Sequence, residues 1–262
     1  MKNTSEIHIA GIIPARYAST RFPGKPLVMI GGKPMIRRVY EQASLSLRTV
    51  YAATDDQRIY DAVAGFGGKV VMTSSEHRSG TDRCAEAAEI ISGLEGFTPD
   101  VIVNIQGDEP FIRPEQIDLL ASCFDDSSVE IATLVRQAEP GEDLANPNQP
   151  KVVLDLSGNA IYFSRSVIPF LRDAPADEWS SRHTFYKHIG LYAYRTDVLK
   201  QLTSLPGSPL EKAESLEQNR WLENGFRIRT AVTLWESLGI DTPEDLERVE
   251  KIFDQKNKNA YL

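Results

Sequence analysis

Residues 7–27 read IHIAGIIPARYASTRFPGKPL, and this stretch decides the fold class of the chain. Its first part, residues 7–13, is apolar and rich in β-branched side chains, and it stops at Pro14. A short continuous apolar run of this kind is typical of a strand that is buried on both faces of a sheet. We therefore expect a buried strand that leads directly into a loop with basic side chains.

Strand and helix patterns alternate after this first strand. We expect further strands at residues 50–53, 69–72 and 100–105, with helices at residues 34–46, from about 57 to 64, and at 81–91. Helices between buried strands indicate an α/β fold whose parallel sheet is covered on both faces. Ligands of such sheets bind outside the carboxyl ends of the strands. The segments that follow these strands should therefore face one crevice.

The second half of the chain is less regular. We expect strands at residues 130–135, 151–156, 160–163, 188–194 and 227–232, a helix over 209–220, and a last helix that starts at Thr242-Pro243. Ser157-Gly158-Asn159 indicates a hairpin turn, and the composition of residues 137–150 and 173–183 favours loops. The pattern contains no clear interdomain linker, so we treat residues 1–262 as a single domain.

Composition and charge disfavour several classes of protein. The 262 residues include 29 Lys and Arg against 37 Asp and Glu, a net charge of −8, which disfavours a broad nucleic-acid-binding surface. The apolar runs fall short of the roughly 20 residues of a membrane span, and the polar N-terminus lacks a signal-peptide pattern. Cys84 and Cys123 have neither zinc-site nor redox spacing. We therefore expect a cytoplasmic protein with no membrane insertion and no nucleic-acid partner.

The loop that follows the first strand carries the clearest functional signal. Residues 14–38 contain six Lys or Arg side chains and no acidic side chain, although the protein as a whole is acidic. Small residues in such a loop let the backbone approach a ligand, and exposed amide groups attract anions. A loop of this composition can simply be solvated, but its place after the first strand favours phosphate binding. Arg16 would then be a bidentate donor and Lys25 a compact charge.

A second polar segment, Gln106-Gly107-Asp108-Glu109-Pro110, directly follows the apolar strand at residues 100–105. A carboxylate at this edge of the sheet stands where a magnesium ion and a polyphosphate would meet, because Mg²⁺ prefers one or two carboxylates plus phosphate oxygens. The alternative is a turn or a helix cap before Pro114. We favour the metal role for Asp108 and a structural role for Glu109.

Other polar segments have two interpretations each. Ser79-Gly80-Thr81-Asp82-Arg83 follows a strand and can line a base or ribose site, but helix capping explains it nearly as well. The segment around Asp241 is typical of a helix start capped by Thr242, and its spacing alone does not favour a ligand role for Asp241. The acidic row within residues 209–220 is typical of a solvated helix face. A lone histidine in an apolar strand, such as His188, is most often a core residue.

The run IIPARYASTRFPGKPL at residues 12–27 closely resembles the N-terminal signature of the CMP-Kdo synthetase family, the 3-deoxy-manno-octulosonate cytidylyltransferases. Further pieces of the chain resemble the family in order and spacing: residues 53–55, 77–83, 103–110, 146–148, 162–165, 188–192, 209–211, 216–218 and 239–246. The resemblance extends over about residues 7–253 and includes both halves of the chain.

This resemblance implies a three-layer α/β/α nucleotidyltransferase fold (nucleotide-diphospho-sugar transferase-like) with a mostly parallel, mixed sheet and a small β-rich dimerisation element. It implies a nucleotide-binding half at about residues 7–130, a sugar-binding and dimerisation half at about 131–240, and a C-terminal helix and tail at 241–262. The implied reaction converts CTP and 3-deoxy-D-manno-octulosonate (Kdo) to CMP-Kdo and pyrophosphate for lipopolysaccharide biosynthesis. Mg²⁺ would be the cofactor, and the enzyme would be a cytoplasmic homodimer.

The resemblance also implies roles for individual residues. Arg16 and Lys25 would hold the triphosphate, and Asp108 and Asp241 would bind magnesium, which reverses the interpretation of Asp241 from spacing alone. Further nucleotide contacts would come from Ser19, Ser79, Gly80, Thr81 and Gln106, and sugar contacts from Gln106, Arg165, Arg172, His188, Tyr192, Glu217 and Gln218. The two arginines of the sugar set suit the carboxylate of the substrate.

The chain departs from the family pattern at two places. Lys187 stands where an arginine is common, and residues 235–238 differ from the glycine- and proline-bearing version that is common in the family. The nearest alternative function is a cytidylyltransferase for another 2-keto sugar acid, such as sialic acid or an amino analogue of Kdo. A nucleotide-binding regulator without turnover is a second alternative, but it would be expected to lack one of the two metal-binding acids.

Overall fold

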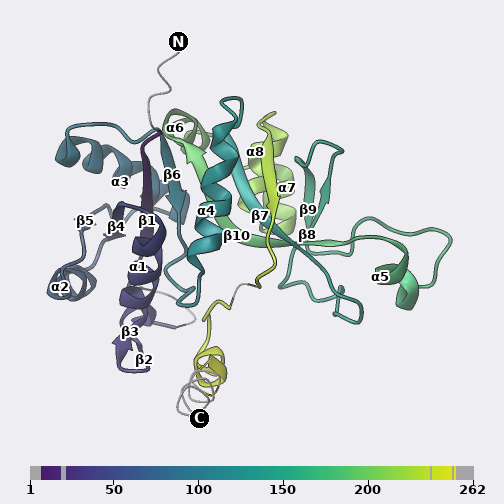
Figure 1. The fold of residues 1–262 in the computed structure, drawn as a ribbon, viewed down its shortest axis with the longest axis horizontal. Coiled ribbons are helices and arrows are strands. Elements are labelled where there is room, and N and C mark those ends of the chain that lie inside the picture. The colour runs from purple at the N-terminus through teal and green to yellow at the C-terminus, as the bar shows by residue number, and fades with distance from the viewer. Residues whose placement is uncertain (1–6, 19–21, 237, 250, 252–262) are drawn as a thin grey trace. The chain divides into compact units, whose positions relative to one another are not determined.

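The computed structural model describes residues 7–18, 22–236, 238–249 and 251, and these residues form two compact units (Figure 1). The first unit holds the described residues up to Ile117 together with those after 237, and the second unit is Asp118–Glu236. The first unit thus joins most of the predicted nucleotide-binding half to the predicted C-terminal helix, although these parts are far apart in the sequence.

A parallel sheet forms the centre of the first unit. Its strands lie in the order β6 (Val101–Asn104), β1 (Ile9–Ala15), β4 (Thr49–Thr54) and β5 (Val70–Met72), and each neighbouring pair is parallel. Apolar side chains fill both faces of the central strands, so that Ile12 and Ile13 on β1 have no exposed surface. The parallel sheet that we predicted from the alternating pattern is therefore confirmed.

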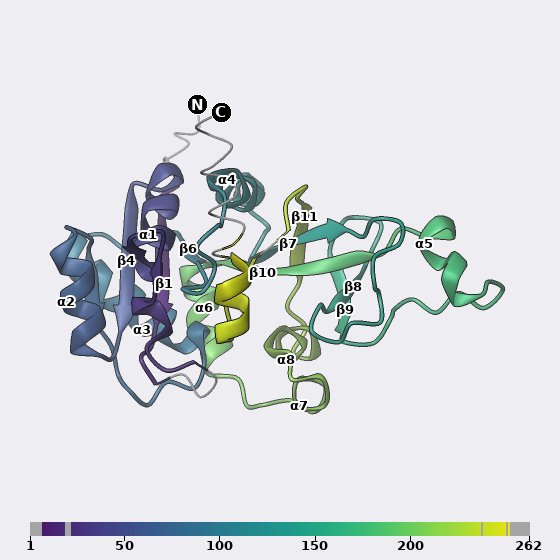
Figure 2. The ribbon, with the colours of Figure 1, turned by 90° about the horizontal axis from the view of Figure 1, so that it is seen from below.

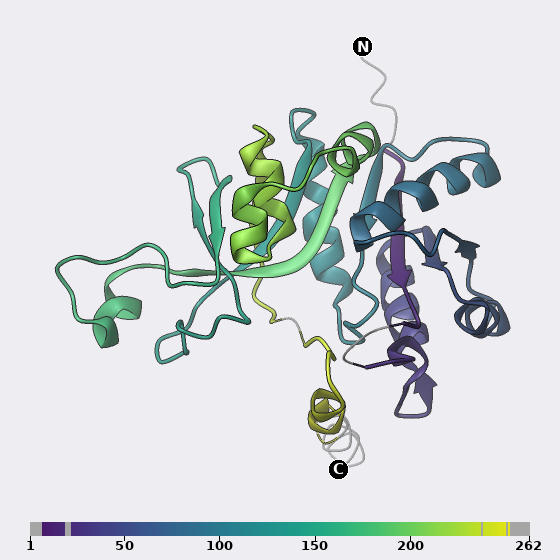
Figure 3. The same ribbon diagram turned by 180° about the vertical axis from the view of Figure 1, so that it is seen from behind.

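Helices α1 (Met35–Ser46), α2 (Gln57–Gly65) and α3 (Gly80–Glu95) connect these strands. The chain steps from β1 outward to β4 and β5 and then returns to β6 on the other side of β1. Right-handed crossovers therefore place α3 on the opposite face of the sheet from α1 and α2, as the views from the two sides show (Figures 1 and 3). The strand order reverses between β1 and β6, and an open α/β sheet binds its ligands at such a point.

The second unit has a mixed sheet. β7 (Ile131–Gln137) is parallel to β11 (Ile228–Val232) and antiparallel to β10 (Tyr186–Arg195), and β10 also pairs with β8 (Lys151–Leu154). β8 and β9 (Ala160–Ser164) form the predicted hairpin, with Gly158 at a φ of 79° in its turn. Helices α6 (Thr196–Thr203), α7 (Pro209–Glu214) and α8 (Glu217–Glu223) belong to the same unit (Figure 2). Parallel pairs in the first unit and mixed pairs here confirm the predicted α/β class.

Several elements differ from the sequence-based expectation. The helix expected over residues 209–220 is broken at Ser215, whose φ of 51° lies in the left-handed region, so α7 and α8 are separate helices. The loop expected at 173–183 contains η3 (Ala176–Glu178) and α5 (Trp179–Arg182). Helix α4 (Pro114–Ser122) matches the alternative of a helix cap before Pro114. Helix α6 was not expected; it begins at Thr196, and its N-cap residue Arg195 makes no side-chain capping hydrogen bond that could have signalled it.

Short elements complete the description: η1 (Lys25–Leu27), β2 (Met29–Ile30), β3 (Lys33–Pro34) and η2 (Cys123–Asp125). η1 carries the lysine of the predicted phosphate loop at its first position, directly after Gly24 in the left-handed conformation. Within the described ranges, no helix has the length and the apolar character needed to cross a membrane.

Candidate active site

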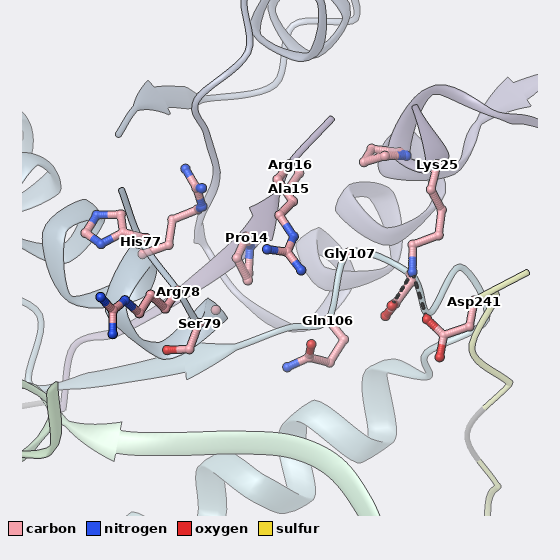
Figure 4. Close-up of a pocket in the computed structure, with 14 residues that line it drawn as sticks. Pro14, Ala15, Arg16, Lys25, His77, Arg78, Ser79, Gln106, Gly107 and Asp241 are labelled. Atoms are coloured by element: carbon pink, nitrogen blue, oxygen red, sulfur yellow. Dashed lines mark hydrogen bonds and ion pairs between the residues drawn. The ribbon is translucent and has the colours of Figure 1, made fainter. Parts of the chain in front are cut away.

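A pocket of the first unit lies beyond the carboxyl ends of β1 and β6 (Figure 4). Its lining comes from the end of β1, the start of η1, the start of α3, the segment after β6 and the segment before the last helix, and includes Pro14, Ala15, Arg16, Lys25, Ser79, Gly80, Gln106, Gly107, Asp108 and Asp241. The predicted phosphate loop and the predicted metal segment thus meet in one pocket, at the point where the strand order reverses.

Lys25 lies between two carboxylates in this pocket (Figure 4). Its Nζ donates to Oδ2 of Asp108 at 2.6 Å and to Oδ1 of Asp241 at 3.1 Å. The Lys25 side chain is 12% exposed, whereas the side chains of Asp108 and Asp241 are 30% and 45% exposed. The ammonium group is therefore largely removed from water, while both carboxylates remain accessible to a ligand.

Asp241 reaches the pocket because apolar side chains on both sides of it anchor this part of the chain. They pack in a buried cluster formed by Ile30, Met35, Ile240 and Val249. The amide of Ile240 also donates to the backbone carbonyl of Asp108 at 2.9 Å. Burial of an apolar side chain and one backbone hydrogen bond thus place Asp241 beside Asp108.

A helix cap fixes the backbone that follows. Residues 243–249 are helical, and Oδ2 of Asp245 accepts hydrogen bonds from the amides of Asp241 and Thr242, both at 3.1 Å. The amide of Asp245 in turn donates to Oγ1 of Thr242 at 3.2 Å. Partial burial acts to raise the pKa of Asp245, but the hydrogen bonds that its carboxylate accepts outweigh burial and lower that pKa. Thr242 is the cap that the sequence predicts, and Asp241 precedes it.

The donor chemistry of the two carboxylates fits a magnesium ion. Mg²⁺ takes oxygen ligands and is usually held by one or two carboxylates together with phosphate oxygens of a substrate. In the part of the chain that the structure describes, no group of three or more His, Cys, Asp or Glu side chains could hold a metal. The protein would therefore supply the pair Asp108 and Asp241, and phosphate and water would supply the remaining ligands. The ammonium of Lys25 between them indicates that this pair accepts a cation.

The segment after β6 passes very close to the end of β1. A Cβ atom on Gly107 would lie 2.8 Å from the carbonyl oxygen of Pro14, which is closer than real Cβ atoms come to the backbone. Only glycine therefore allows the backbone before Asp108 to lie against the segment that carries Arg16, and both of these side chains line the pocket.

Gly107→Ala should push these two segments apart. We expect the free energy of unfolding to fall by about 1–3 kcal/mol, as at other overpacked positions. Gly93→Ala is the matched control, because a Cβ on this helical residue of α3 would meet nothing within 4 Å, and alanine should stabilise a helix by up to about 1 kcal/mol there. Urea unfolding measures the free energy of unfolding of both variants. An unchanged stability of Gly107→Ala would contradict the close approach.

The start of α3 forms another part of the pocket. Oγ of Ser79 accepts from the amide of Asp82 at 3.1 Å, and the Asp82 carboxylate accepts from the amide of Ser79 at 3.2 Å, so the predicted helix cap is present. Ser79 and Gly80 also line the pocket, whereas Thr81 is buried and does not. Both interpretations of this segment are therefore compatible, since helix N-termini attract anions. Ser19, which we predicted to contact the nucleotide, lies outside the described residues.

Arg83, the last residue of the segment that can line a base or ribose site, also lines this pocket. It is buried, and its Nη2 donates to Oδ2 of Asp55 at 2.9 Å while its Nη1 donates to Oγ1 of Thr73 at 2.5 Å. Asp55 and Thr73 directly follow β4 and β5, so Arg83 ties the start of α3 to the carboxyl ends of two strands. A basic residue one turn into a helix, with an aspartate after a neighbouring strand, is the signal that could have revealed this pair.

In the second unit, two residues predicted to bind sugar form an aromatic cluster with α8, the helix that carries a third such residue, Gln218. The His188 ring lies 5.2 Å from that of Tyr192, and the Tyr192 ring lies 5.1 Å from that of Trp221 on α8. Gln218 on the same helix is 5% exposed, and its Nε2 makes no hydrogen bond with any described residue. A buried amide donor without a partner is unfavourable by about 1–3 kcal/mol, and an acceptor on a bound ligand or water would satisfy it.

Tyr192 and Glu217 add a donor and a charge to this cluster. Burial raises the pKa of Tyr192 well above its ordinary value, and the neighbouring Tyr194 and Glu217 contribute to the shift. The Tyr192 hydroxyl therefore stays protonated at physiological pH and can donate to a sugar oxygen. Glu217 pairs with Arg220, whose Nη2 lies 2.7 Å from its Oε1. His188, Tyr192 and Glu217 thus lie close together, and Gln218 follows Glu217 on α8.

The His188 ring is neutral because burial in this cluster lowers its pKa to about 3. Its Nε2 lies 3.0 Å from Oγ1 of Thr133 on β7, which fixes the orientation of the ring. Thr133 also hydrogen-bonds to the carbonyl of Leu191, where β10 has an irregular register. The ring is therefore suited to a neutral hydrogen bond with a sugar hydroxyl and unsuited to proton transfer near pH 7.

We expect the His188 resonances in an NMR titration to stay those of a neutral ring from pH 8 down to pH 5, with His188→Gln used for assignment. An unfolded histidine takes up a proton below about pH 6.5, whereas folded His188 does so only near pH 3. The unfolded state binds more protons between these values, so this residue makes the fold less stable as the pH falls from 6.5 toward 3. Protonation of His188 with a midpoint near 6.5 would contradict this environment.

The remaining residues predicted to contact sugar are placed differently. The guanidinium of Arg165 donates to three backbone carbonyls, and Arg172 is exposed. No hydrogen bond or ring contact within the described ranges joins Arg172 to the His188 cluster. Gln106 belongs to the first unit, where it lines the pocket and its Nε2 lies 3.5 Å from Oδ1 of Asn104.

A family model described as cytidylyltransferase matches residues 10–230. The 3-deoxy-manno-octulosonate cytidylyltransferase of Parabacteroides distasonis is 62% identical over 242 residues, with 91% of this chain and 95% of that protein covered. The enzyme of the same name from Bacteroides thetaiotaomicron is 58% identical over 250 residues, with 94% and 98% covered.

A solved structure of CMP:2-keto-3-deoxy-manno-octonic acid synthetase complexed with CTP has a TM-score of 0.86 and 42% sequence identity, with 95% of this chain and 99% of that chain covered. A cytidylyltransferase from Leptospira borgpetersenii, with a TM-score of 0.60 and 17% identity over 95% and 88% of the two chains, shares the fold. The chain therefore belongs to the cytidylyltransferase family, among the 3-deoxy-manno-octulosonate cytidylyltransferases.

Proposed function

We propose that the protein transfers CMP from CTP to the anomeric hydroxyl of Kdo and releases pyrophosphate. The observation that carries this proposal is the pocket in which Lys25, Asp108 and Asp241 meet beyond the carboxyl ends of β1 and β6. Its basic and acidic groups suit a metal–polyphosphate, and relatives 62% and 58% identical to this chain bear the name of this activity.

In the proposed reaction, the anomeric oxygen of Kdo forms a bond to the α-phosphorus of CTP. The bond from this phosphorus to the oxygen that bridges to the β-phosphorus breaks, pyrophosphate leaves, and the hydroxyl proton passes to water. Catalysis of this kind depends on positioning and charge neutralisation, so the proposal needs no dedicated protein base. Arg16 and Lys25 hold the triphosphate and stabilise the negative charge that builds on the leaving pyrophosphate.

Asp108 and Asp241 would hold Mg²⁺, which when bound supplies positive charge beside the phosphates and lowers the pKa of the attacking hydroxyl. Both residues are held in place for this role, Asp241 by the Ile240 hydrogen bond and by the cap at Thr242. His188, Tyr192, Glu217 and Gln218 would bind the hydroxyl groups of the sugar acid. The nearly buried amide of Gln218 supports this assignment.

The pathway, the compartment and the oligomeric state of the protein are also proposals. The product CMP-Kdo would serve lipopolysaccharide biosynthesis in the cytoplasm, and the active form would be a homodimer. Large exposed apolar side chains in the second unit, among them Leu156, Ile161, Phe170 and Leu234, support a dimer surface there. Light scattering coupled to size-exclusion chromatography would test the assembly, and a monomer at micromolar concentration would contradict it.

Pyrophosphate release from CTP, measured with and without Kdo and Mg²⁺, tests the function directly. We expect release only when CTP, Kdo and Mg²⁺ are all present. A panel of sugar acids that includes sialic acid and an amino analogue of Kdo decides the specificity, because these candidates share the chemistry and differ in the sugar contacts. Turnover with another acid and none with Kdo would overturn the assignment of Kdo. CTP binding without turnover on any acid would favour a regulator.

A further inference from the structure

Arg165 makes three hydrogen bonds to backbone carbonyls of the second unit. Its Nε donates to the carbonyl of Glu214 at 2.7 Å, its Nη1 to that of Pro147 at 2.8 Å, and its Nη2 to that of Ser215 at 3.2 Å. The guanidinium thus joins the loop around Pro147 to the turn between α7 and α8. An arginine held by three carbonyls in a fixed geometry serves as a structural fork.

Glu214, the last residue of α7, holds the same region from the other side. Its Oε2 accepts from the backbone amide of Arg165 at 2.9 Å, and its Oε1 accepts from Oγ of Ser164 at 2.6 Å and from the hydroxyl of Tyr162 at 3.2 Å. Partial burial acts to raise the pKa of Glu214, but these donors outweigh burial and lower it. The carboxylate therefore stays charged and keeps α7 attached to the end of β9.

Lys151 on β8 binds the backbone on both sides of this region. It has no exposed surface, and its Nζ donates to the carbonyls of Asn146 at 3.0 Å and Arg165 at 2.7 Å. A buried ammonium group is expensive to desolvate, so its two carbonyl partners must be held firmly. Lys151, Arg165 and Glu214, which we call the turn clamp, together fasten β8, β9 and the α7–α8 turn to one another.

The turn that the clamp holds controls where α8 begins. Ser215 adopts a left-handed φ of 51°, which is unfavourable for a residue other than glycine, and α8 starts two residues later at Glu217. Farther along α8, the Asn219 side chain both donates to and accepts from the backbone of Phe163 on β9, at 3.0 and 3.4 Å. Glu217 and Gln218 therefore lie between two attachments to β9, and α8 lies beside this strand (Figure 3).

We propose that Lys151, Arg165 and Glu214 are positioning residues for the sugar acid. They hold the α7–α8 turn and thereby fix where Glu217 and Gln218 lie. The inference deepens the proposed function and rests on it. It offers an alternative to the expectation that Arg165 contacts the substrate carboxylate itself, because three of the five N–H donors of Arg165 already face backbone carbonyls.

Steady-state kinetics of Arg165→Lys, Glu214→Gln and Lys151→Met tests the clamp. We expect each variant to raise the KM for Kdo on the order of tenfold while the KM for CTP stays within about twofold, since a small misplacement of binding groups has effects of this size. The double variant Arg165→Lys/Glu214→Gln should lose less than the product of the single losses, because the two residues hold one turn. Arg195→Lys is the matched control, since Arg195 also donates to two backbone carbonyls of the second unit, those of Phe124 and Val129, away from this turn.

A substrate analogue separates the clamp from direct contact. If Arg165 binds the carboxylate of Kdo, the loss caused by Arg165→Lys should vanish with the carboxamide of Kdo, and this result would overturn the proposal. If Arg165 acts through the turn, the same fold-loss should persist with the carboxamide. Equal rises in the KM values for Kdo and CTP would also overturn it, because they would indicate general destabilisation.

Trp221 gives a readout that does not depend on turnover. It lies on α8, is almost completely buried against Tyr192 and Tyr194, and is one of three tryptophans in the chain. In a Trp179→Phe/Trp235→Phe background, Glu214→Gln should shift its emission to the red, and Arg195→Lys should leave it unchanged. An unaltered emission in every folded clamp variant would overturn the proposal. Absence of turnover with Kdo in the wild type would instead refute the proposed function, whatever the emission shows.

Discussion

Asp241→Asn is expected to lower kcat/KM on the order of 10²-fold or more, measured as pyrophosphate release with Kdo and CTP. Its carboxylate lies beside that of Asp108 around a common cation, at 3.1 and 2.6 Å from the Lys25 ammonium. The amide of asparagine removes the negative charge but keeps the size of the side chain, so the loss reports charge and metal binding. Preorganised charges of this kind are worth about 3–4 kcal/mol in a transition state.

The magnesium dependence gives this prediction its specificity. Asp241→Asn should need a higher Mg²⁺ concentration for half-maximal turnover, and Asp108→Asn should show the same change. Glu244→Gln is the matched control, since Glu244 is an exposed carboxylate three residues away on the same helix start. Normal turnover of Asp241→Asn at low Mg²⁺ would show that Asp241 is outside the metal site.

The strands of the first unit were predictable because their signal is local. The apolar runs at residues 7–13 and 100–105 became β1 and β6, within a few residues of their expected bounds. The rule that ligands bind at the carboxyl ends of parallel strands then placed the loops after these strands in one pocket, as the structure does. Local periodicity and one topological rule are sufficient for this part.

Contacts between segments that are distant in the sequence could not be predicted from local patterns. Lys25 is separated from Asp108 by 83 residues and from Asp241 by 216, and no short pattern carries information about such pairs. Spacing alone disfavoured a ligand role for Asp241, and only the family resemblance pointed to it. The physical reason for its place is the burial of Ile240 and Val249 in the first unit, a tertiary contact.

The acidic row of the second unit shows where a helical pattern misleads. Glu211, Glu214, Glu217 and Gln218 have the spacing of one solvated face, yet Ser215 breaks the helix and rotates α8 so that Gln218 is buried. The carbonyl of Ser215, in this left-handed turn, accepts a hydrogen bond from Arg165, which directly follows β9. Helix propensity predicts the ends of a helix poorly where a tertiary contact of this kind holds a strained residue.

Lys25→Met should move two measurements in opposite directions. Turnover at saturating CTP and Mg²⁺ is expected to fall on the order of 10²-fold or more, because the ammonium no longer stabilises the charge on the leaving pyrophosphate. In the absence of nucleotide, however, the affinity for Mg²⁺ should rise. The Lys25 ammonium occupies the space between Asp108 and Asp241, so a metal ion must displace it, and methionine removes this competing charge while it keeps the length of the side chain.

Lys33→Met is the matched control for this prediction, since Lys33 belongs to the same acid-free basic stretch but pairs with Glu41 on α1. It should leave both turnover and Mg²⁺ affinity unchanged. Isothermal titration of the nucleotide-free protein with Mg²⁺ measures the affinity, and pyrophosphate release measures turnover. Normal turnover of Lys25→Met would remove Lys25 from the catalytic set. A loss of turnover together with a loss of Mg²⁺ affinity would mean that Lys25 holds the two carboxylates in place and does not compete with the metal, because the ion pair would then be needed to form the site.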